Sequence, residues 1–300
     1  MLPPTGDQYE LRAGGYAAVV TQGGAALRAL TYEGRELVHG FGPDEMPHRC
    51  RGQLLAPWPN RIRDGRYRYD GAEHQLAITE VPLDNAIHGL VRWAPWMVTG
   101  QTESAVTLGC RVLAQTGYPW SIELATTYSL GSDGLTVTQS VTNQSSSVAP
   151  YASGAHPFLT LPSGRVDGWT LRAPAATRLP SDERMLPTGD REAVAGTAYD
   201  FREGRVVGDV KLDDCFTDLI RDESGIATVR LSEGSHAVEL WLDDTQPWLM
   251  LFSDDGEGPS RQGLAVEPMT APVDAFNSGD GVRHLEPGET FTATWGIRAA

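Results

Sequence analysis

Apolar and polar residues alternate with a period of two in short runs along this chain, and turn residues separate the runs about every ten positions. The run 105–112 places four apolar side chains on one face of an extended strand: Val106, Leu108, Cys110 and Val112. Successive side chains of a strand point to opposite faces, so this pattern indicates a sheet buried on one side. Helical periodicity is scarce. We therefore predict an all-β fold with more than a dozen antiparallel strands, as in a large sandwich or barrel.

The same alternation recurs in 122–130 and 135–141, which predicts two consecutive hairpins, and again in 236–242 and 291–297. The 33 glycines and 20 prolines are spread over the whole length, and no linker or internal repeat divides the chain. We expect residues 1–300 to form a single β-sandwich domain.

The formal net charge of −15 and the pI near 4.8 disfavour nucleic acid or an anionic membrane as a partner. A small neutral ligand meets no such repulsion. The first ten residues lack a basic region followed by an apolar run, and no uncharged apolar stretch is long enough to span a membrane. We expect a cytoplasmic protein.

Motifs for metals and cofactors are missing from the sequence. Its cysteines are spaced widely and irregularly, as free thiols are: Cys50, Cys110 and Cys215. Lys211 is the sole lysine, which rules out a Walker-type phosphate loop and argues against Schiff-base chemistry. Asp213, Asp214 and Asp218 lack the spacing of a calcium loop. We predict no metal and no cofactor.

Two histidines and one glutamate stand out by their neighbours. Gly89 follows His88, as expected where the backbone turns closely beside a ligand. Pro157 follows His156 and disfavours helix there, which holds this histidine at the margin of a strand. Glu267 closes an apolar strand, so its carboxylate has to be solvated, paired or functional. Taken singly, each residue also fits a purely structural role.

Residues 54–71 combine a donor-rich pair, Asn60 and Arg61, with the aromatic side chain of Trp58. Sugars are bound through hydrogen bonds to their hydroxyls and through packing of C–H groups on aromatic rings. These residue types supply both kinds of contact. An arginine-rich surface hairpin is the alternative interpretation of the same segment.

Six segments, in this order, resemble motifs of the aldose 1-epimerases, or galactose mutarotases. They are NRI at 60–62, IHG at 87–89, GYP at 117–119, HPFLTL at 156–161, LDDCF at 212–216 and VEPMTAPVDAFN at 266–277. LEPGETF at 285–291 extends the last of them. Each motif alone is common, but the order and approximate spacing of the series are specific. The resemblance runs from about residue 50 to residue 298.

The resemblance implies a galactose mutarotase-like supersandwich, a large antiparallel β-sandwich whose concave face holds a sugar. It implies an isomerase that interconverts the α and β anomers of a free hexose by opening the ring at C1. Glu267 would be the general base, His156 the general acid, and His88 a partner that orients the sugar and supports the acid. The residues implied to bind sugar hydroxyls are Asn60, Arg61 and Asp213. The oligomeric state, monomer or homodimer, stays open.

Anomer interconversion removes the proton of the C1 hydroxyl while the ring oxygen gains one. For this chemistry we expect the pKa of Glu267 to lie near its ordinary value, which leaves the carboxylate ionised at pH 7. We expect nearby acids to keep His156 partly protonated.

Departures from the family motifs leave the preferred sugar open. Leu90 follows the HG pair, Phe158–Thr160 replace a more common YFN, and Met250 occupies a position where a sugar-binding Gln is frequent.

A hexose-6-phosphate 1-epimerase is the first alternative, with a phosphate pocket formed by three arginines: Arg49, Arg51 and Arg92. A glycosidase using Asp213 and Glu267 is a second. A lectin-like binding protein without catalysis is a third.

Overall fold

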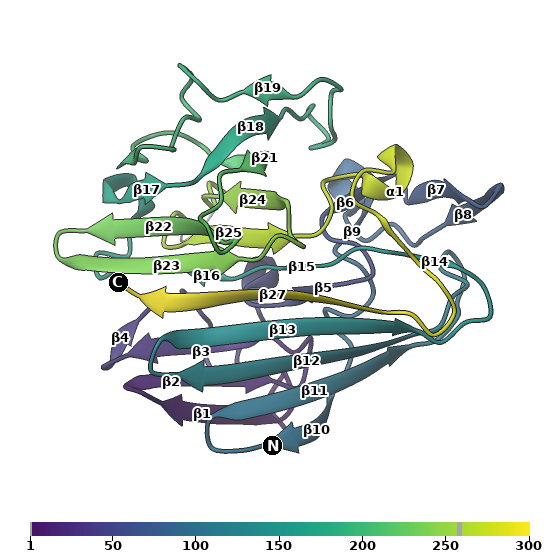
Figure 1. Ribbon diagram of the computed structural model, residues 1–300, viewed down its shortest axis with the longest axis horizontal. Coiled ribbons are helices and arrows are strands. Elements are labelled where there is room, and N and C mark those ends of the chain that lie inside the picture. The colour runs from purple at the N-terminus through teal and green to yellow at the C-terminus, as the bar shows by residue number, and fades with distance from the viewer. Residues whose placement is uncertain (1, 257–259) are drawn as a thin grey trace.

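The computed structural model describes residues 2–256 and 260–300 (Figure 1). Within these residues the chain forms mostly β-strands, arranged in two large antiparallel sheets and several smaller ones. Side chains from both large sheets meet in one hydrophobic core. The predicted all-β antiparallel sandwich is confirmed.

The larger sheet has nine described strands in the order β10-β11-β12-β13-β27-β23-β22-β17-β20. Their bounds are β10 (Met97–Gln101), β11 (Ala105–Val112), β12 (Ile122–Gly131), β13 (Gly134–Asn143), β27 (Thr290–Ala299), β23 (His236–Leu242), β22 (Ala227–Glu233), β17 (Thr170–Arg172) and β20 (Arg205–Val206). Strands β11, β12 and β13 form the two predicted hairpins. The C-terminal strand β27 lies in the middle of the sheet, between β13 and β23 (Figure 1).

The second sheet has eight described strands, seven of them in the order β19-β18-β21-β24-β25-β15-β5, while β16 also pairs with β25. Their bounds are β19 (Glu192–Ala193), β18 (Ala175–Leu179), β21 (Asp213–Leu219), β24 (Trp248–Phe252), β25 (Leu264–Met269), β15 (Gly154–Ala155), β5 (Leu54–Leu55) and β16 (Phe158–Leu159).

Smaller elements complete the described fold. A four-stranded sheet consists of β1 (Gln8–Ala13), β2 (Tyr16–Thr21), β3 (Leu27–Tyr32) and β4 (Arg35–Glu36). The two-stranded pairs are β6 (Arg61–Arg63) with β9 (Asn85–Ile87), β7 (Arg66–Tyr69) with β8 (Ala72–Gln75), and β14 (Ala149–Tyr151) with β26 (Arg283–Leu285). The helices are α1 (Ala275–Ser278), η1 (His48–Cys50), η2 (Val81–Leu83) and η3 (Val166–Gly168). In the described part of the chain, no helix has the length and apolarity to cross a membrane.

Strands β24 and β25 are buried on both faces, and the two faces meet different surroundings. Leu264 and Val266 point into the main core. Trp248, Met250 and Met269, one position out of phase, belong to a second, smaller apolar cluster. Because side chains alternate along a strand, Glu267 shares this second face with Met269. The functional residues described below occupy this face.

Candidate active site

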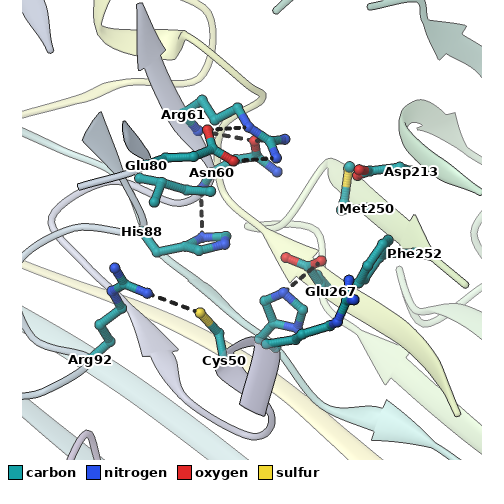
Figure 2. A pocket seen from close by; sticks show the side chains of 13 residues that line it. Cys50, Asn60, Arg61, Glu80, His88, Arg92, Asp213, Met250, Phe252 and Glu267 are labelled. Atoms are coloured by element: carbon teal, nitrogen blue, oxygen red, sulfur yellow. Dashed lines mark hydrogen bonds and ion pairs between the residues drawn. The ribbon is translucent and has the colours of Figure 1, made fainter. Parts of the chain in front are cut away.

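A cavity of about 210 Å³ opens on the second face of the eight-stranded sheet (Figure 2). The residues that line it are Arg49, Cys50, Asn60, Arg61, Glu80, Ile87, His88, Arg92, His156, Asp213, Met250, Phe252 and Glu267. All six residues predicted for the site are among them. They come from five separate segments of the chain, and the fold brings them together.

Strand register places one wall of the cavity. Met250 pairs with Glu267 across β24 and β25, and Asp213 pairs with Phe252 across β21 and β24. Directly paired residues of adjacent strands project from the same face of a sheet, as do residues two apart on one strand. Glu267, Met250, Phe252 and Asp213 therefore point into the cavity together.

A break in the sheet makes room for His156. Strand β25 pairs with β16 at its start and with β15 at Met269, and His156 lies between β15 and β16. The His156 backbone is held by Gln53, whose carbonyl accepts the His156 N–H at 3.0 Å, while the His156 carbonyl accepts from Gly52 N–H at 2.8 Å. The predicted position at a strand margin is confirmed.

Glu267 and His156 both line the cavity, and Glu267 Oε1 lies 3.3 Å from His156 Nε2. Glu267 is 1% exposed and His156 is 5% exposed. The second carboxyl oxygen, Oε2, is buried and has no hydrogen-bond partner among the described residues. Unpartnered buried polar atoms are rare, and one that lines a cavity is suited to a ligand. The expected strand-end position of Glu267 is wrong, because β25 continues through Met269.

Burial sets the protonation of this pair, contrary to the expectation from the sequence. Burial raises the pKa of Glu267 well above its ordinary value, and the nearby charge of Asp213 adds to this effect. Burial lowers the pKa of His156 to about 3. Burial therefore disfavours the ionised form of both groups.

His88 and Asn60 fix each other on the opposite wall. His88 N–H donates to the Asn60 carbonyl at 2.9 Å, and Asn60 N–H donates to His88 Nδ1 at 3.2 Å. Burial lowers the pKa of His88, so its ring is neutral. Because Nδ1 accepts a hydrogen bond, the ring proton is assigned to Nε2. His88 can then donate a hydrogen bond to a ligand.

Two expectations about neighbouring residues are wrong. Gly89 does take a positive φ of 70°, but its close contact is the Ala56 backbone, since an added Cβ would lie 2.0 Å from the Ala56 carbonyl oxygen. The glycine serves chain packing and not ligand approach. Trp58 is 2% exposed and packs at 6.0 Å from the ring of Phe276, so its aromatic face does not line the cavity.

Arg61 is oriented by Glu80, a residue that the sequence did not single out. Arg61 Nε and Nη2 each donate to a carboxylate oxygen of Glu80 at 2.8 Å. Such a two-point ion pair holds the guanidinium in one plane. Asn85 Nδ2 donates to Glu80 at 3.1 Å, and Asp274 N–H donates to the Arg61 carbonyl at 2.8 Å, which ties the helix α1 region to this wall.

Asp213 has an unusual ionisation. Burial raises its pKa from 3.8 to about 6, Asp214 adds to the rise, and Arg61 opposes it. The other two acids of this segment do not join it: Asp214 forms an ion pair with Arg178 at 2.6 Å, and Asp218 is exposed. Among residues 2–256 and 260–300, no group of three or more potential metal ligands is found.

We expect Asp213→Asn to stabilise the protein at neutral pH. Between pH 3.8 and about 6 the folded state keeps a proton that the unfolded state has lost, so stability falls as the pH rises through this window. Above pH 6 the ionised, half-buried Asp213 costs about 3 kcal/mol at most, and asparagine removes this cost. Urea unfolding should show a more stable variant at pH 7.5 and a vanishing difference near pH 4.

Asp218→Asn, an exposed change on the same strand, is the matched control and should show no such pH-dependent gain. An Asp213→Asn variant whose stability difference stays the same at pH 4 and pH 7.5 would contradict the raised pKa.

A sequence model of the family described as aldose 1-epimerase matches residues 7–298 of the chain. The chain belongs to the aldose 1-epimerase family. This is a family of isomerases that act on carbohydrates, and the resemblance inferred from the motifs is confirmed.

Three relatives of this aldose 1-epimerase family member show the range of similarity. The protein YihR of Escherichia coli (strain K12) is 36% identical over 286 residues, covering 95% of this chain and 91% of its own. Galactose mutarotase of Homo sapiens is 30% identical over 162 residues, covering 51% of this chain and 45% of its own. The crystal structure of a GalM/aldose epimerase homologue from C. elegans superposes with a TM-score of 0.86 at 21% identity, covering 98% of both chains.

Of the family departures, Phe158 and Met250 are placed at the site by the fold. Phe158 stacks on the His156 ring, with centroids 5.2 Å apart and planes inclined by 10°, so it supports the imidazole. Met250 lines the cavity beside Glu267. Glu80, Cys50 and Phe252 were missed as lining residues, since none stands in a motif with a chemical signature, and Ile87 of the IHG motif was not singled out.

Proposed function

We propose that this protein interconverts the α and β anomers of a hexose, with Glu267 and His156 exchanging protons with the C1 hydroxyl and the ring oxygen. The observation that carries the proposal is the buried contact between Glu267 and His156, with a carboxyl oxygen of Glu267 left free toward the cavity. An acid and a base side by side are what ring opening at C1 requires.

The reaction needs one proton on the pair of Glu267 and His156. In our scheme Glu267 accepts the proton of the C1 hydroxyl while His156 donates one to the ring oxygen, and the ring opens to the aldehyde. The pair then stands as protonated Glu267 and neutral His156, which is the state that burial favours. Rotation about C1–C2 and the reverse transfers close the ring as the other anomer. The starting, charge-separated state has to be populated when sugar binds.

The remaining cavity residues would position the sugar. His88 can donate from Nε2, and Arg61, held flat by Glu80, can donate to two hydroxyls. Asp213, with a pKa of about 6, is mostly ionised at neutral pH and can accept from a hydroxyl. Asn60 contributes its amide, since its Oδ1 already accepts from Arg61 N–H at 3.0 Å.

The geometry of the site and the similarity to known enzymes both favour this activity over that of a non-catalytic lectin. A binding site needs no proton donor and acceptor in contact, and placing both in a buried position costs free energy. The galactose mutarotase relative supports an anomer-interconverting enzyme over a glycosidase.

Polarimetry on freshly dissolved α-glucose and α-galactose tests the proposal. The protein is expected to bring at least one of the two sugars to anomeric equilibrium faster than buffer alone does. Equilibration of both at the buffer rate would speak against a mutarotase of free hexoses. Unchanged optical rotation after equilibrium, with no glycoside cleaved, separates this activity from hydrolysis.

A further inference from the structure

The three arginines that line the cavity differ in how their charges are balanced. Arg61 pairs with Glu80 at 2.8 Å, and Arg49 pairs with Asp254 at 2.7 Å. Arg92 has no carboxylate partner among the described residues. In a chain with a formal net charge of −15, a partly buried guanidinium without a counter-ion at a ligand cavity needs an explanation.

Arg92 is held in place, but by neutral groups. Its Nη1 donates to Cys50 Sγ at 3.2 Å, and its guanidinium lies 5.7 Å from the ring centroid of Trp93. Gln53 Nε2 donates to the Arg92 carbonyl at 2.6 Å. Burial raises the pKa of Cys50, so the sulfur stays a neutral thiol and does not offset the positive charge. Among the described residues the other guanidinium N–H groups of Arg92 have no hydrogen-bond partner, so they are available to a ligand.

Arg92 lies on the side of the cavity that holds His88 and His156, away from Asp213. In Figure 2, Arg92 and Cys50 lie on the opposite side of Glu267 from Asp213 and Met250. The charge of Arg92 helps to lower the pKa of both His88 and His156, whereas Asp213 is the charge that raises the pKa of Glu267.

The covalent structure of a pyranose relates this position to one carbon of the sugar. Our proposed function places C1 at Glu267 and the ring oxygen at His156. C5 is bonded to the ring oxygen on the side away from C1, and it carries the exocyclic C6. C6 therefore extends beyond His156, toward Arg92, while C2 lies on the side of Asp213.

We propose that the substrate is a hexose with an anionic group on C6, and that Arg92 binds this group. The inference rests on the proposed function and names its substrate class. A neutral hydroxymethyl group would leave the charge of Arg92 unbalanced, whereas phosphate, sulfonate or carboxylate oxygens match the planar donors of a guanidinium. Arg92 is a specificity-determining residue in this proposal and takes no part in proton transfer.

The test compares sugars that differ only at C6. The rate of anomer exchange at equilibrium, followed by NMR, gives kcat/KM for glucose, glucose 6-phosphate, glucuronate and the 6-sulfonate of 6-deoxyglucose. We expect at least one anionic sugar to exceed glucose by about tenfold or more, as one charge-assisted hydrogen bond allows. The most favoured of the three identifies the anion.

Variants connect the preference to Arg92. Arg92→Met keeps the length of the side chain without its charge, and should reduce the ratio of anionic to neutral kcat/KM by about tenfold or more. Arg92→Lys should restore part of the ratio. Arg68→Met, an exposed change outside the cavity, is the control and should leave the ratio as it is. Inorganic phosphate or sulfate should inhibit the wild type competitively and Arg92→Met more weakly.

The outcomes separate the two proposals. If glucose is converted but no anionic sugar is preferred, the inference about C6 is wrong and the proposed function stands. If the anionic preference survives in Arg92→Met, Arg92 is not the residue that binds the anion. If no sugar is converted, the proposed function itself fails. Should Arg92→Met not fold, as judged by circular dichroism, the wild-type comparison and Arg92→Lys still decide.

Discussion

Glu267→Gln is expected to slow anomer interconversion by at least about a hundredfold, and His156→Asn to do the same. Glutamine keeps the shape of Glu267 and can still contact His156 Nε2, but it cannot accept a proton. Asparagine removes the titratable ring. Polarimetry or NMR exchange on the sugar that the wild type converts best measures both losses.

Glu267→Gln should lose activity without losing stability. Burial disfavours the ionised carboxylate, so a neutral amide at this position should leave the protein as stable as the wild type, or more stable, at neutral pH. Glu123→Gln and His236→Asn change exposed residues outside the cavity and serve as controls with full activity. A Glu267→Gln or His156→Asn protein that keeps more than about a tenth of the wild-type rate would remove these residues from the proposed proton transfers.

Glu80→Ala is expected to destabilise the fold by about 3 kcal/mol, because it leaves the buried guanidinium of Arg61 without its two-point partner. The side chains of Arg61 and Glu80 are 10% and 17% exposed, so water replaces the lost contact poorly. KM for the sugar should also rise, since Arg61 loses the orientation that directs its donors into the cavity. Urea unfolding and steady-state kinetics measure the two effects.

The pair of Arg111 and Glu123 offers a matched comparison. It has a similar distance, 2.9 Å, but its side chains are 62% and 47% exposed. Glu123→Ala should therefore change the stability by less than about 0.5 kcal/mol. A double-mutant cycle of Glu80→Ala with Arg61→Met isolates the coupling of the buried pair. Equal losses from Glu80→Ala and Glu123→Ala would show that burial adds nothing to the Arg61–Glu80 interaction.

The fold class was predictable because each strand can be recognised from the alternation of apolar and polar residues within its own short segment. The alternation in 105–112, 122–130 and 135–141 reflects one buried and one exposed face, and the structure has strands β11, β12 and β13 there. Strand β25 was harder to delimit. It is buried on both faces, so it shows no alternation, and the sequence placed its end at Glu267 whereas the strand continues through Met269.

The sequence predicted which residues belong to the site. It did not predict the contacts that these residues make with their neighbours. The ordered motifs pointed to His88, His156 and Glu267, and all three line one cavity. Nothing near Glu80 in the sequence indicates that it returns to Arg61, because that contact depends on the pairing of β9 with β6 and on the bridge between Glu80 and Asn85. The neutral surroundings of Arg92 are hidden for the same reason: Cys50 lies 42 positions away.

The all-β fold, and the place of His156 and Glu267 in one ordered set of family motifs, could be inferred from the amino-acid sequence alone. The pKa values of these two groups depend on the tertiary structure. A pKa depends on the water and charges around a group, and these are set by segments distant in the chain. Packing on both faces of β25 removes water from Glu267 and His156, which raises the pKa of Glu267 and lowers the pKa of His156.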